Sequence, residues 1–321
     1  MVRVAEALGA AQHGRTTPVT VIVNRAARSA AGVPWSRVVD ELRAHDLAPV
    51  LLRPATRAEA VAAARMAARR GVGVVVAAGG DGTVNTVVNA VAGFGVAVAI
   101  LPLGTANDLA REVGLPLDAA GAARVLGACR ARRVDLVDVG GRAFATVGGV
   151  GLPAACALAV DRLRARSRIA RRLLGRLGTG VYPLVAAATI LGAAAAPRRL
   201  RIAYRDPAGA TRTIDTVAHG VFVANQRALA AGLALPTGSV NDDGVFELCV
   251  VRDVSRARLL QALGCLRLGR PVPPGVFAVY RATRARIHSE VEDTFFGDGD
   301  ALARGRRFDL HVRPRALRVL C

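Results

Sequence analysis

The sequence predicts an α/β fold in two domains: an N-terminal domain built on a parallel sheet, and a β-rich, sandwich-like C-terminal domain with antiparallel strands. Before residue 140, short apolar runs alternate with alanine-rich runs of helical length, which is the pattern of βαβ units. After that point, β-type runs follow one another with few helical runs between them, which favours antiparallel pairing. A chain of 321 residues is long enough to bury two cores.

In the first half, the strand candidates are short, mostly apolar β-rich runs, and a helical run separates each from the next. Strands are predicted at residues 19–24, 49–55, 71–78 and 95–103, and helices at 36–45, 57–70 and 83–91. Continuous apolar strands are typical of a parallel sheet that is covered on both faces. We therefore predict an α/β domain at residues 18–139. Residues 1–17 are expected to be an N-terminal extension, since they lack the apolar stretch of a signal peptide.

The second half is predicted to form the β-rich domain, residues 140–321. Helical runs are expected at 153–166, 168–196 and 257–268, and strands at 246–251, 284–290 and 306–312, with a hairpin around the turn Asp206–Gly209. The uncharged stretch 177–197 is long enough to span a bilayer, but its alanines, glycines and two prolines favour a buried core helix. The arginine-rich stretch 162–176 could lie on an anionic membrane surface or form a solvated helix face.

The charge balance excludes several classes of enzyme. The chain has 44 basic residues, all of them arginine, against 24 acidic residues, for a net charge of +20. Without lysine there is no Walker A phosphate loop, no protein-kinase site and no Schiff-base chemistry. The arginine surplus is consistent with codon bias in a GC-rich genome, yet its field attracts anionic membranes, nucleic acid or phosphate ligands. Because aromatic residues make up only 4% of the chain, no specific nucleic-acid partner is expected.

The five cysteines are widely spaced, and no Cys-x-x-Cys pair occurs. This spacing predicts neither a disulfide framework nor a zinc site. We therefore expect reduced thiols and a cytoplasmic protein.

A glycine-rich segment, Gly79–Asn85 (GGDGTVN), directly follows a predicted buried strand and directly precedes a predicted helix. Glycines let a backbone come within hydrogen-bond reach of a ligand, and a helix N-terminus offers N–H groups and the positive end of its dipole. The segment is therefore predicted to cradle phosphates without a lysine. Asp81, between two glycines, would be poorly placed as a simple helix cap and is expected to engage Mg²⁺. The alternative is a tight turn that uses glycine for its geometry alone.

A second segment, Pro102–Arg111 (PLGTANDLAR), follows the next predicted strand. In a parallel sheet both loops lie at the carboxyl edge, where ligands bind. Thr105 could hydrogen-bond a phosphate or a ribose, and Asn107 or Asp108 could cap the helix that starts there.

These two motifs resemble those of the diacylglycerol kinase catalytic-domain family, which includes sphingosine kinases and bacterial lipid kinases. A single GGDGT is only moderately specific, because NAD kinases and phosphofructokinases carry similar loops. Four later stretches also resemble the family pattern: Val147–Gly151, Ala224–Pro236, Asn241–Val245 and Phe296–Asp300. The ordered set extends the resemblance over nearly the whole chain.

The resemblance implies ATP-dependent transfer of the γ-phosphoryl group to a hydroxyl of a diacylglycerol-like or sphingoid lipid. Asp300 would accept the proton of the lipid hydroxyl, with Asp298 as the alternative base and Asp81 as a further catalytic carboxylate. A structural Mg²⁺ would be held by Asp243 and by the carbonyls of Val240 and Val245. The residues expected to hold ATP are Asn24, Thr56, Gly79, Gly80, Asp81, Gly82, Thr83, Val84, Asn85 and Thr105.

The sequence departs from the family at three positions. Thr86 stands where the family has Glu, Asn24–Arg28 replaces an Asn-Pro-x-x-Gly loop, and Asp300 replaces a Glu. Two other readings stay open, an NAD kinase-like enzyme and a non-catalytic arginine-rich protein that binds membranes or nucleic acid. The kinase hypothesis expects a peripheral membrane protein whose Asp81→Asn variant loses turnover with its fold intact. The oligomeric state is left open, with a homodimer as one option.

Overall fold

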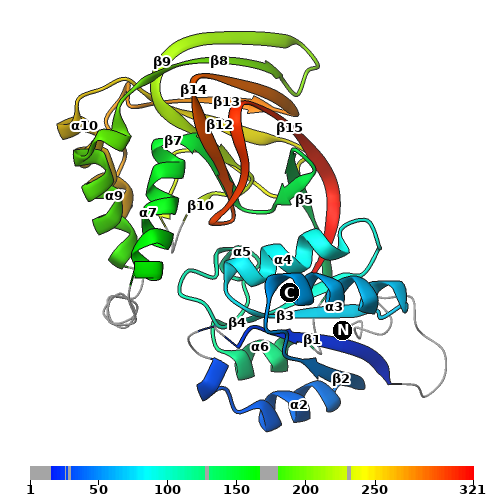
Figure 1. The fold of residues 1–321 in the computed structure, drawn as a ribbon. Helices are drawn as coiled ribbons and strands as arrows, with labels where there is room; N and C mark the ends of the chain where they lie inside the picture. Colours follow the sequence, from blue (N-terminus) through cyan, green and yellow to red (C-terminus); the bar gives the residue numbers. More distant parts are fainter. Residues whose placement is uncertain (1–15, 26, 28–29, 127–129, 167–179, 230–232) are drawn as a thin grey trace. The chain divides into compact units, whose positions relative to one another are not determined.

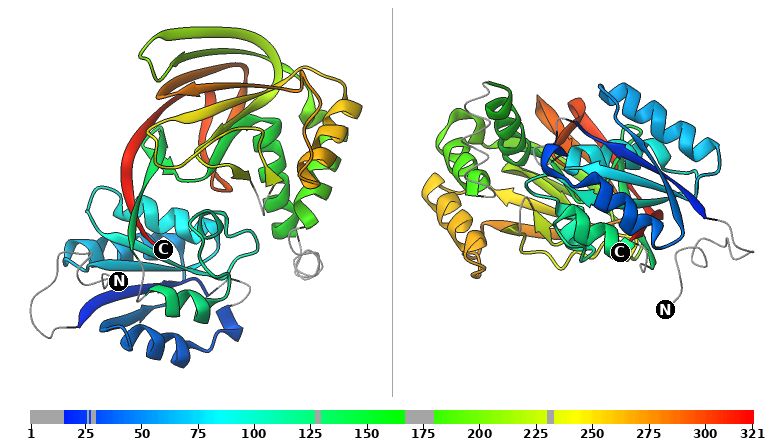
Figure 2. Two further views of the ribbon diagram at one scale, coloured as in Figure 1. Left: turned by 180° about the vertical axis from the view of Figure 1, so that it is seen from behind. Right: turned by 90° about the horizontal axis from the view of Figure 1, so that it is seen from below.

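The computed structural model describes residues 16–25, 27, 30–126, 130–166, 180–229 and 233–321. The chain forms two compact units (Figures 1 and 2). One consists of Met1–Val134 together with Arg315–Cys321, and the other of Asp135–Pro314. The sequence places the domain boundary after residue 139 and assigns the C-terminal residues to the second domain, whereas Arg315–Cys321 belong to the first unit.

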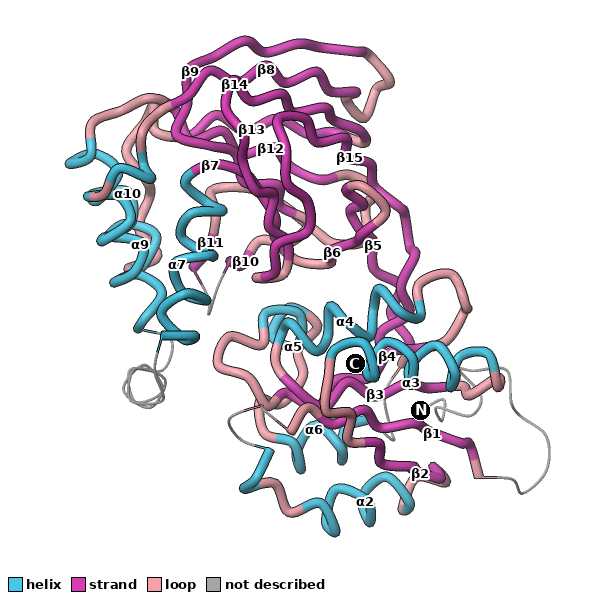
Figure 3. Tube along the Cα trace, viewed as in Figure 1, coloured by secondary structure: helices cyan, strands magenta, loops and turns pink. Residues whose placement is uncertain are grey.

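Helices and strands alternate through the first unit (Figure 3). In order they are β1 (Thr17–Val23), η1 (Ala30–Gly32), α2 (Trp35–Arg43), β2 (Leu47–Leu52), α3 (Arg57–Arg69), β3 (Val74–Gly79), α4 (Asp81–Val91), β4 (Ala97–Pro102), α5 (Asp108–Glu112) and α6 (Ala119–Leu126). The predicted strands and helices of this half are thus present within a few residues of their expected bounds. Helix α5 is the helix expected to start at Asn107 or Asp108, whereas helix α6 is not among the predicted elements.

The strands of the first unit are ordered β2-β1-β3-β4, and the end of β15 (Asp300–Leu320) adds a fifth beside β4. All four pairings are parallel; Val19, for example, pairs with Pro49 on β2 and with Val74 on β3. Strands β3 and β4 are buried along their whole length, as their continuous apolar runs predict. Because the order reverses between β1 and β3, the carboxyl ends of these strands form the switch point where such sheets bind ligands.

Helices cover both faces of this sheet. Helices α3 and α4 pack together on one face, and α2 and α6 pack together on the other (Figure 1). The α2–α6 side encloses a core of aliphatic side chains, in which Leu42, Leu101 and Leu126 are almost fully buried. The layers therefore hold the switch point on a rigid support.

Strands dominate the second unit. Its elements are β5 (Ala131–Val139, which begins in the first unit), β6 (Arg142–Phe144), β7 (Val147–Gly151), α7 (Leu152–Arg166), α9 (Val181–Leu191), η3 (Ala193–Ala195), β8 (Arg198–Arg205), β9 (Thr211–Ala224), β10 (Ala228–Leu229), β11 (Leu233–Ala234), β12 (Phe246–Arg252), α10 (Arg256–Arg267), β13 (Phe277–Ala282), β14 (Arg284–Gly297) and β15. The predicted hairpin is confirmed, since β8 and β9 pair around a turn in which Gly209 donates to the Asp206 carbonyl.

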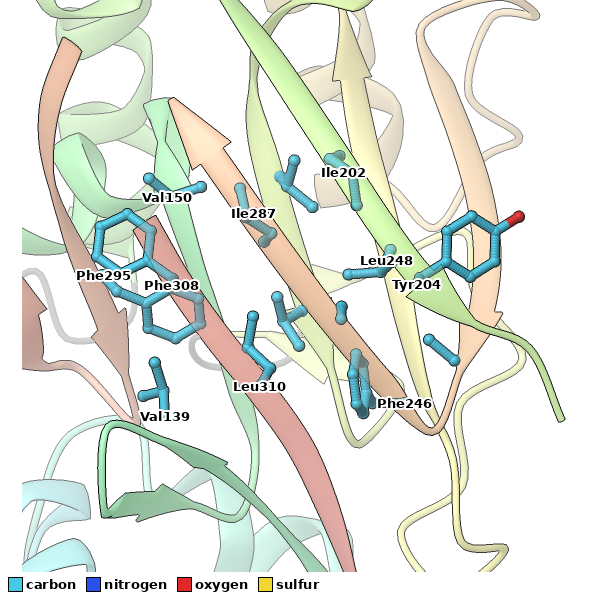
Figure 4. Packing of buried hydrophobic residues seen from close by; sticks show 14 of the residues in the cluster. Val139, Val150, Ile202, Tyr204, Phe246, Leu248, Ile287, Phe295, Phe308 and Leu310 are labelled. Atoms are coloured by element: carbon cyan, nitrogen blue, oxygen red, sulfur yellow. The ribbon is translucent and has the colours of Figure 1, made fainter. Parts of the chain in front are cut away.

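The strand pairs of the second unit are antiparallel, and they close around one core. The long strands β9 and β14 each pair with β7 through one half and with β8 through the other. Inside lie the aromatic rings of Phe144, Phe295 and Phe308, with ring centres 5.9 and 5.6 Å apart along the series, and aliphatic side chains such as Ile202 and Ile287 (Figure 4).

Helices α7, α9 and α10 pack side by side as a layer of this unit (Figures 1 and 2).

The prediction of a buried core helix in the uncharged stretch is wrong for α9, because only Val181 and Ile190 of this helix are buried. Its predicted extent also differs, since α9 ends at Leu191. Part of the arginine-rich stretch 162–176 lies outside the described residues. Among the residues that the structure describes, no helix is both long and apolar enough to cross a membrane.

Candidate active site

Three sequence segments meet at the carboxyl edge of the parallel sheet. Asn24, which follows β1, donates from Nδ2 to Thr83 Oγ1 at 2.9 Å and from its backbone N–H to the Ala78 carbonyl at 3.0 Å. The N–H of Leu103, at the end of β4, donates to the Gly79 carbonyl at 2.9 Å. The loops after β1, β3 and β4 are thus joined directly at the switch point.

The two glycine-containing loops touch backbone to backbone. A Cβ added to Gly104 would lie 2.5 Å from Gly80 Cα, and a Cβ added to Gly80 would lie 3.0 Å from Gly104 Cα. A Cβ on Gly79 would lie 2.3 Å from Thr83 Oγ1. These close approaches explain why glycine stands at all three positions. They also leave the rim of the sheet lined by backbone atoms.

Helix α4 starts inside the glycine-rich segment. Gly80 is its extended N-cap, and the N–H groups of Thr83 and Val84 donate to the Gly80 carbonyl at 2.9 and 3.1 Å. The first turn of a helix leaves N–H groups without intrahelical partners and carries the positive end of the dipole. Since Gly80 has no side chain with which to cap these groups, this end of α4 suits an anion.

Asp81 spans the two loops. Its carboxylate accepts hydrogen bonds from the backbone N–H groups of Asn107 at 3.0 Å and Asp108 at 2.7 Å. These amides belong to the start of α5, so Asp81 caps a helix of the neighbouring loop. Asp81 does not cap its own helix α4, as the flanking glycines predict, but its role as the cap of α5 was not predicted.

Asn107 closes the second loop. It has a left-handed backbone (φ 50°), and its side chain accepts from the Gly104 N–H and donates to the Gly104 carbonyl, both at 3.0 Å. It occupies the N-cap position of α5 but makes no side-chain capping bond there. The expected cap by Asn107 is therefore replaced by the cap from Asp81.

Thr56 is the N-cap of α3. Its hydroxyl accepts from the Glu59 N–H at 3.2 Å, and the Glu59 carboxylate accepts from the Ala55 N–H at 2.8 Å, which is close to a capping box. The side chain is exposed, so the hydroxyl of Thr56 is open to solvent while it caps the helix.

The remaining predicted nucleotide residues differ in accessibility. Thr105 is half-buried in the loop after β4, next to the Gly80–Gly104 contact. Val84 is 7% exposed, and Asn85 is fully buried in α4. The Asn85 side chain receives hydrogen bonds from Asn89 at 3.2 Å and from Arg57 at 3.5 Å. Burial gives Val84 and Asn85 a packing role within α4, in contrast to Gly80 and Gly104, which are partly exposed, and Gly82, which is exposed.

The capping role of Asp81 makes a testable prediction. We expect Asp81→Ala to lower the free energy of unfolding by about 1–2 kcal/mol, because two amides at the start of α5 lose a charged acceptor. Asp81→Asn keeps one acceptor oxygen and should lose less. Chemical denaturation followed by circular dichroism measures both. An Asp81→Ala variant that unfolds at the wild-type midpoint would contradict the capping role.

In the second unit, Asp298 lies in the turn between β14 and β15, and Asp300 directly follows that turn. Asp298 and Gly299 have positive φ values of 51° and 83°, as in the type I′ turns that favour Asp-Gly. The Asp298 carboxylate is 8% exposed and accepts from the N–H groups of Ala145 (3.0 Å) and Thr146 (2.8 Å) and from the Thr146 hydroxyl (2.6 Å). Asp298 therefore fastens the hairpin to the loop between β6 and β7, and these bonds oppose its expected use as an alternative base.

Asp300 is placed differently. It is the first residue of β15, pairs with Gly297 across the turn, and is half-buried. One oxygen of its carboxylate, Oδ2, is buried, although the residue as a whole is more exposed than Asp298. The two acidic residues, two positions apart in the sequence, have distinct surroundings.

Asn225 and Asp135 extend the network around the β6–β7 loop. The Asn225 side chain is fully buried and donates to the carbonyls of Asp135 at 2.9 Å and Ala145 at 2.8 Å. The buried Asp135 carboxylate accepts from the Gly244 N–H, and its backbone N–H donates to the Asn241 carbonyl, both at 2.6 Å. Three motifs of the second unit are therefore linked through buried hydrogen bonds.

The turn around Asp243, the predicted metal site, carries oxygen donors and a nearby cation. Asp243 forms an ion pair with Arg281 at 2.6 Å and accepts from the Val245 N–H at 3.2 Å. Arg281 also lies 3.4 Å from the buried Glu247 carboxylate. Burial raises the pKa of Glu247, and a hydrogen bond from Ser239 partly offsets that rise. Within the described ranges, no group of three or more His, Cys, Asp or Glu residues could hold a metal, so a cation here would rely on one carboxylate and backbone carbonyls.

Sequence reasoning missed several residues of this network. Ala145 and Thr146 act through backbone N–H groups, which leave no trace in a motif. Asp135 did leave a signal, because it is an acidic residue inside an otherwise apolar run, VDLVDV. A buried carboxylate requires hydrogen-bonding partners, so such a residue predicts a polar network.

Comparison with known proteins connects both units to one family. Residues 18–139 match the family model described as the diacylglycerol kinase catalytic domain. Residues 154–321 match the model described as the YegS C-terminal NAD kinase beta sandwich-like domain.

Individual relatives and a solved structure agree with these matches. The chain is 49% identical over 85 residues to a Pseudomonas aeruginosa protein named Probable lipid kinase YegS-like, covering 25% of this chain and 28% of that protein. It is 40% identical over 96 residues to a Bacillus subtilis protein named Diacylglycerol kinase, covering 29% of this chain and 32% of that protein. These alignments thus span about a third or less of each relative's length.

The fold is shared over almost the whole chain. A crystal structure described as a diacylglycerol kinase from Bacillus anthracis superposes with a TM-score of 0.75 at 19% identity, covering 96% of this chain and 98% of that one. The match of residues 154–321 to the YegS-type model alone covers just over half of the chain. The chain therefore belongs to the family that joins a diacylglycerol kinase catalytic domain to a YegS-type C-terminal domain.

Proposed function

We propose that this protein is an ATP-dependent lipid kinase that phosphorylates a hydroxyl group of a diacylglycerol-like or sphingoid lipid. The observation that carries the proposal is the backbone contact between Gly80 and Gly104 beside the N-terminus of α4, at the switch point of the parallel sheet. Membership of the family supports it.

The switch-point rim fits the phosphates of ATP. A Cβ at Gly80 or Gly104 would fill the place where the two loops approach, so the rim offers N–H groups without bulky side chains. In this proposal the amides of Gly80–Gly82 bind phosphate oxygens, the Thr105 hydroxyl contacts the nucleotide, and Asn24 and Asp81 hold the loops in place. Because the chain has no lysine, amides, arginines and Mg²⁺ must neutralise the phosphate charge.

The acceptor hydroxyl requires a base, and we assign that role to Asp300. ATP supplies the phosphoryl group when it is bound. The Asp300 carboxylate takes the proton of the lipid hydroxyl, while Asp298 keeps the turn in place through Ala145 and Thr146. The half-buried position of Asp300 at the start of β15 suits a group that must meet a substrate.

The turn around Asp243 fits a structural Mg²⁺ by donor type, since one carboxylate and backbone carbonyls are the hard oxygen ligands that this ion takes along with waters. The carboxylate of Asp243 and the carbonyls of Val240 and Val245 would hold it. Arg281 already pairs with the same carboxylate, so the guanidinium and the ion would compete.

This competition makes the Mg²⁺ site testable without an activity assay. We expect Mg²⁺ to raise the thermal unfolding midpoint of the wild type, because binding to the folded state stabilises it. Asp243→Asn should abolish the rise, and Arg281→Ala should lower the Mg²⁺ concentration that produces it. Equal Mg²⁺ responses in all three proteins, measured by differential scanning fluorimetry, would contradict the site.

The proposed activity is tested with γ-labelled ATP and Mg²⁺ against diacylglycerol and sphingosine in mixed micelles. Labelled lipid that depends on the native protein is the expected result. NAD is offered in a parallel reaction, because the matched C-terminal model is described as NAD kinase-like. Formation of NADP⁺ without labelled lipid would replace the proposal by the NAD kinase alternative.

A further inference from the structure

Helix α9 is apolar on all sides yet partly exposed. Its sequence, VYPLVAAATIL, contains no charged residue. Leu184 and Leu191 are 60% and 57% exposed. Together with Leu268 (66%), which directly follows α10, they are three of the four most exposed large apolar side chains among the described residues.

The exposed residues of α9 share one face. Leu184, Ala188 and Leu191 are exposed and follow the i, i+4, i+7 spacing, which places them within one stripe along the helix. A surface helix of a water-soluble protein normally turns charged or polar residues outward. An apolar stripe in that position marks a binding surface.

The stripe is held rigidly in the helical layer. Arg256, at the start of α10, donates to the carbonyls of Leu191 at 2.7 Å and Gly192 at 3.2 Å. The buried His219 of β9 joins the segment after α9 to the segment before α10, since its ring nitrogens lie 2.5 Å from the Ala195 carbonyl and 2.9 Å from the Val254 carbonyl. The exposed stripe therefore lies on a helix that is fixed in a packed layer.

Positive charge accompanies the apolar residues. The stretch between Asp161 and Asp206, which contains α9, has no Asp or Glu. The stretch between Asp253 and Glu290, which contains α10, has none either. Arg267 and Arg270 flank Leu268 at the end of α10 and are exposed. Within these two stretches, exposed apolar side chains and arginines occur without carboxylates, a combination that is complementary to an anionic bilayer with its apolar interior.

We propose that the α9–α10 surface, consisting of Leu184, Ala188, Leu191, Arg267, Leu268 and Arg270, docks onto an anionic lipid bilayer. The eleven-residue helix α9 is about 16 Å long, roughly half the thickness of the hydrocarbon core, so it lies in the interface. The inference goes beyond the proposed kinase activity, because docking requires neither nucleotide nor phosphoryl transfer.

Charge argues against a second copy of the chain as the occupant. Two copies that meet through this surface would bring Arg267 and Arg270 of each chain together, in a protein whose net charge is +20. Like charges at an interface oppose association. An anionic bilayer receives the same arginines favourably, at about fivefold in affinity for each.

The experiment measures sedimentation of the full chain with vesicles of phosphatidylcholine and phosphatidylglycerol, without nucleotide. We expect binding that weakens with salt and is much weaker to vesicles of phosphatidylcholine alone. The double variant Leu184→Gln/Leu191→Gln should bind at least tenfold more weakly. Arg267→Ala/Arg270→Ala should weaken binding about tenfold or more, and only to the anionic vesicles.

Matched variants elsewhere separate the surface from general effects. Val50→Gln changes an apolar side chain of β2 that is 58% exposed, and Arg284→Ala removes an exposed charge from β14. Both should bind vesicles like the wild type. The proposal is overturned if the wild-type protein does not bind anionic vesicles. It is also overturned if the leucine double variant binds them as strongly as the wild type does. A leucine double variant that only shifts from dimer to monomer in gel filtration also overturns the proposal, because a second copy of the chain would then occupy the surface. Because these assays contain no ATP, their failure leaves the kinase assay to decide the proposed function.

Discussion

Asp300→Asn should lower kcat by about 10²- to 10⁴-fold and leave the unfolding midpoint close to that of the wild type. The amide cannot accept the proton of a lipid hydroxyl, whereas its size and its place at the start of β15 stay the same. Steady-state phosphorylation of a micellar lipid measures kcat and KM. A loss confined to kcat would identify a group that acts in the reaction itself.

Asp300→Glu provides the matched control. The related kinases resembled by this chain carry glutamate at this position, so the longer carboxylate should keep measurable activity. If Asp300→Asn keeps activity within a few-fold of the wild type, Asp300 is not the base. If Asp300→Glu and Asp300→Asn are equally inactive, the carboxylate is not what matters at this position.

Asp298→Asn should have the opposite signature, a loss of free energy of unfolding of about 3 kcal/mol or more. The Asp298 carboxylate is buried and holds the N–H groups of Ala145 and Thr146 and the Thr146 hydroxyl. Asparagine offers one acceptor oxygen in place of two and turns an NH₂ group toward these donors. Urea denaturation measures the change as a lower midpoint at unchanged slope.

Two further variants define this effect. Thr146→Val removes only the hydroxyl donor and should cost less than Asp298→Asn. Glu292→Gln, on the same hairpin, breaks an exposed ion pair with Arg304 at 2.9 Å and should cost about 1 kcal/mol or less. An Asp298→Asn protein as stable as Glu292→Gln would show that the buried network contributes little.

The fold of the first unit could be predicted well because its signals are local. Continuous apolar runs, helical runs of alanine and the glycines after β3 each act within a few residues. The position of the glycine loops at one edge also follows from sequence, because parallel strands end at the same side. The contact between Gly80 and Gly104 is a direct result of that rule.

The roles of the acidic residues could not be predicted, because they depend on partners distant in the chain. Asp81 caps a helix whose amides lie 26 and 27 residues away. Asp298 holds amides 152 and 153 residues away. The resemblance names Asp300 as the base and Asp298 as the alternative, but the buried hydrogen bonds of Asp298 are evident only from the tertiary structure. Likewise, the composition of α9 predicts burial, but its neighbours leave one face uncovered.

The return of β15 to the first sheet has a consequence for biosynthesis. Arg318 and Val319 pair with β4, so the ribosome must translate all of Asp135–Pro314 before this pairing can form. At the usual 5–20 residues per second, β4 keeps an unpaired edge for roughly ten seconds or longer, and such edges promote aggregation. A shortened protein that ends at residue 139 would carry that edge permanently, and fusing the 315–321 peptide to it should restore solubility.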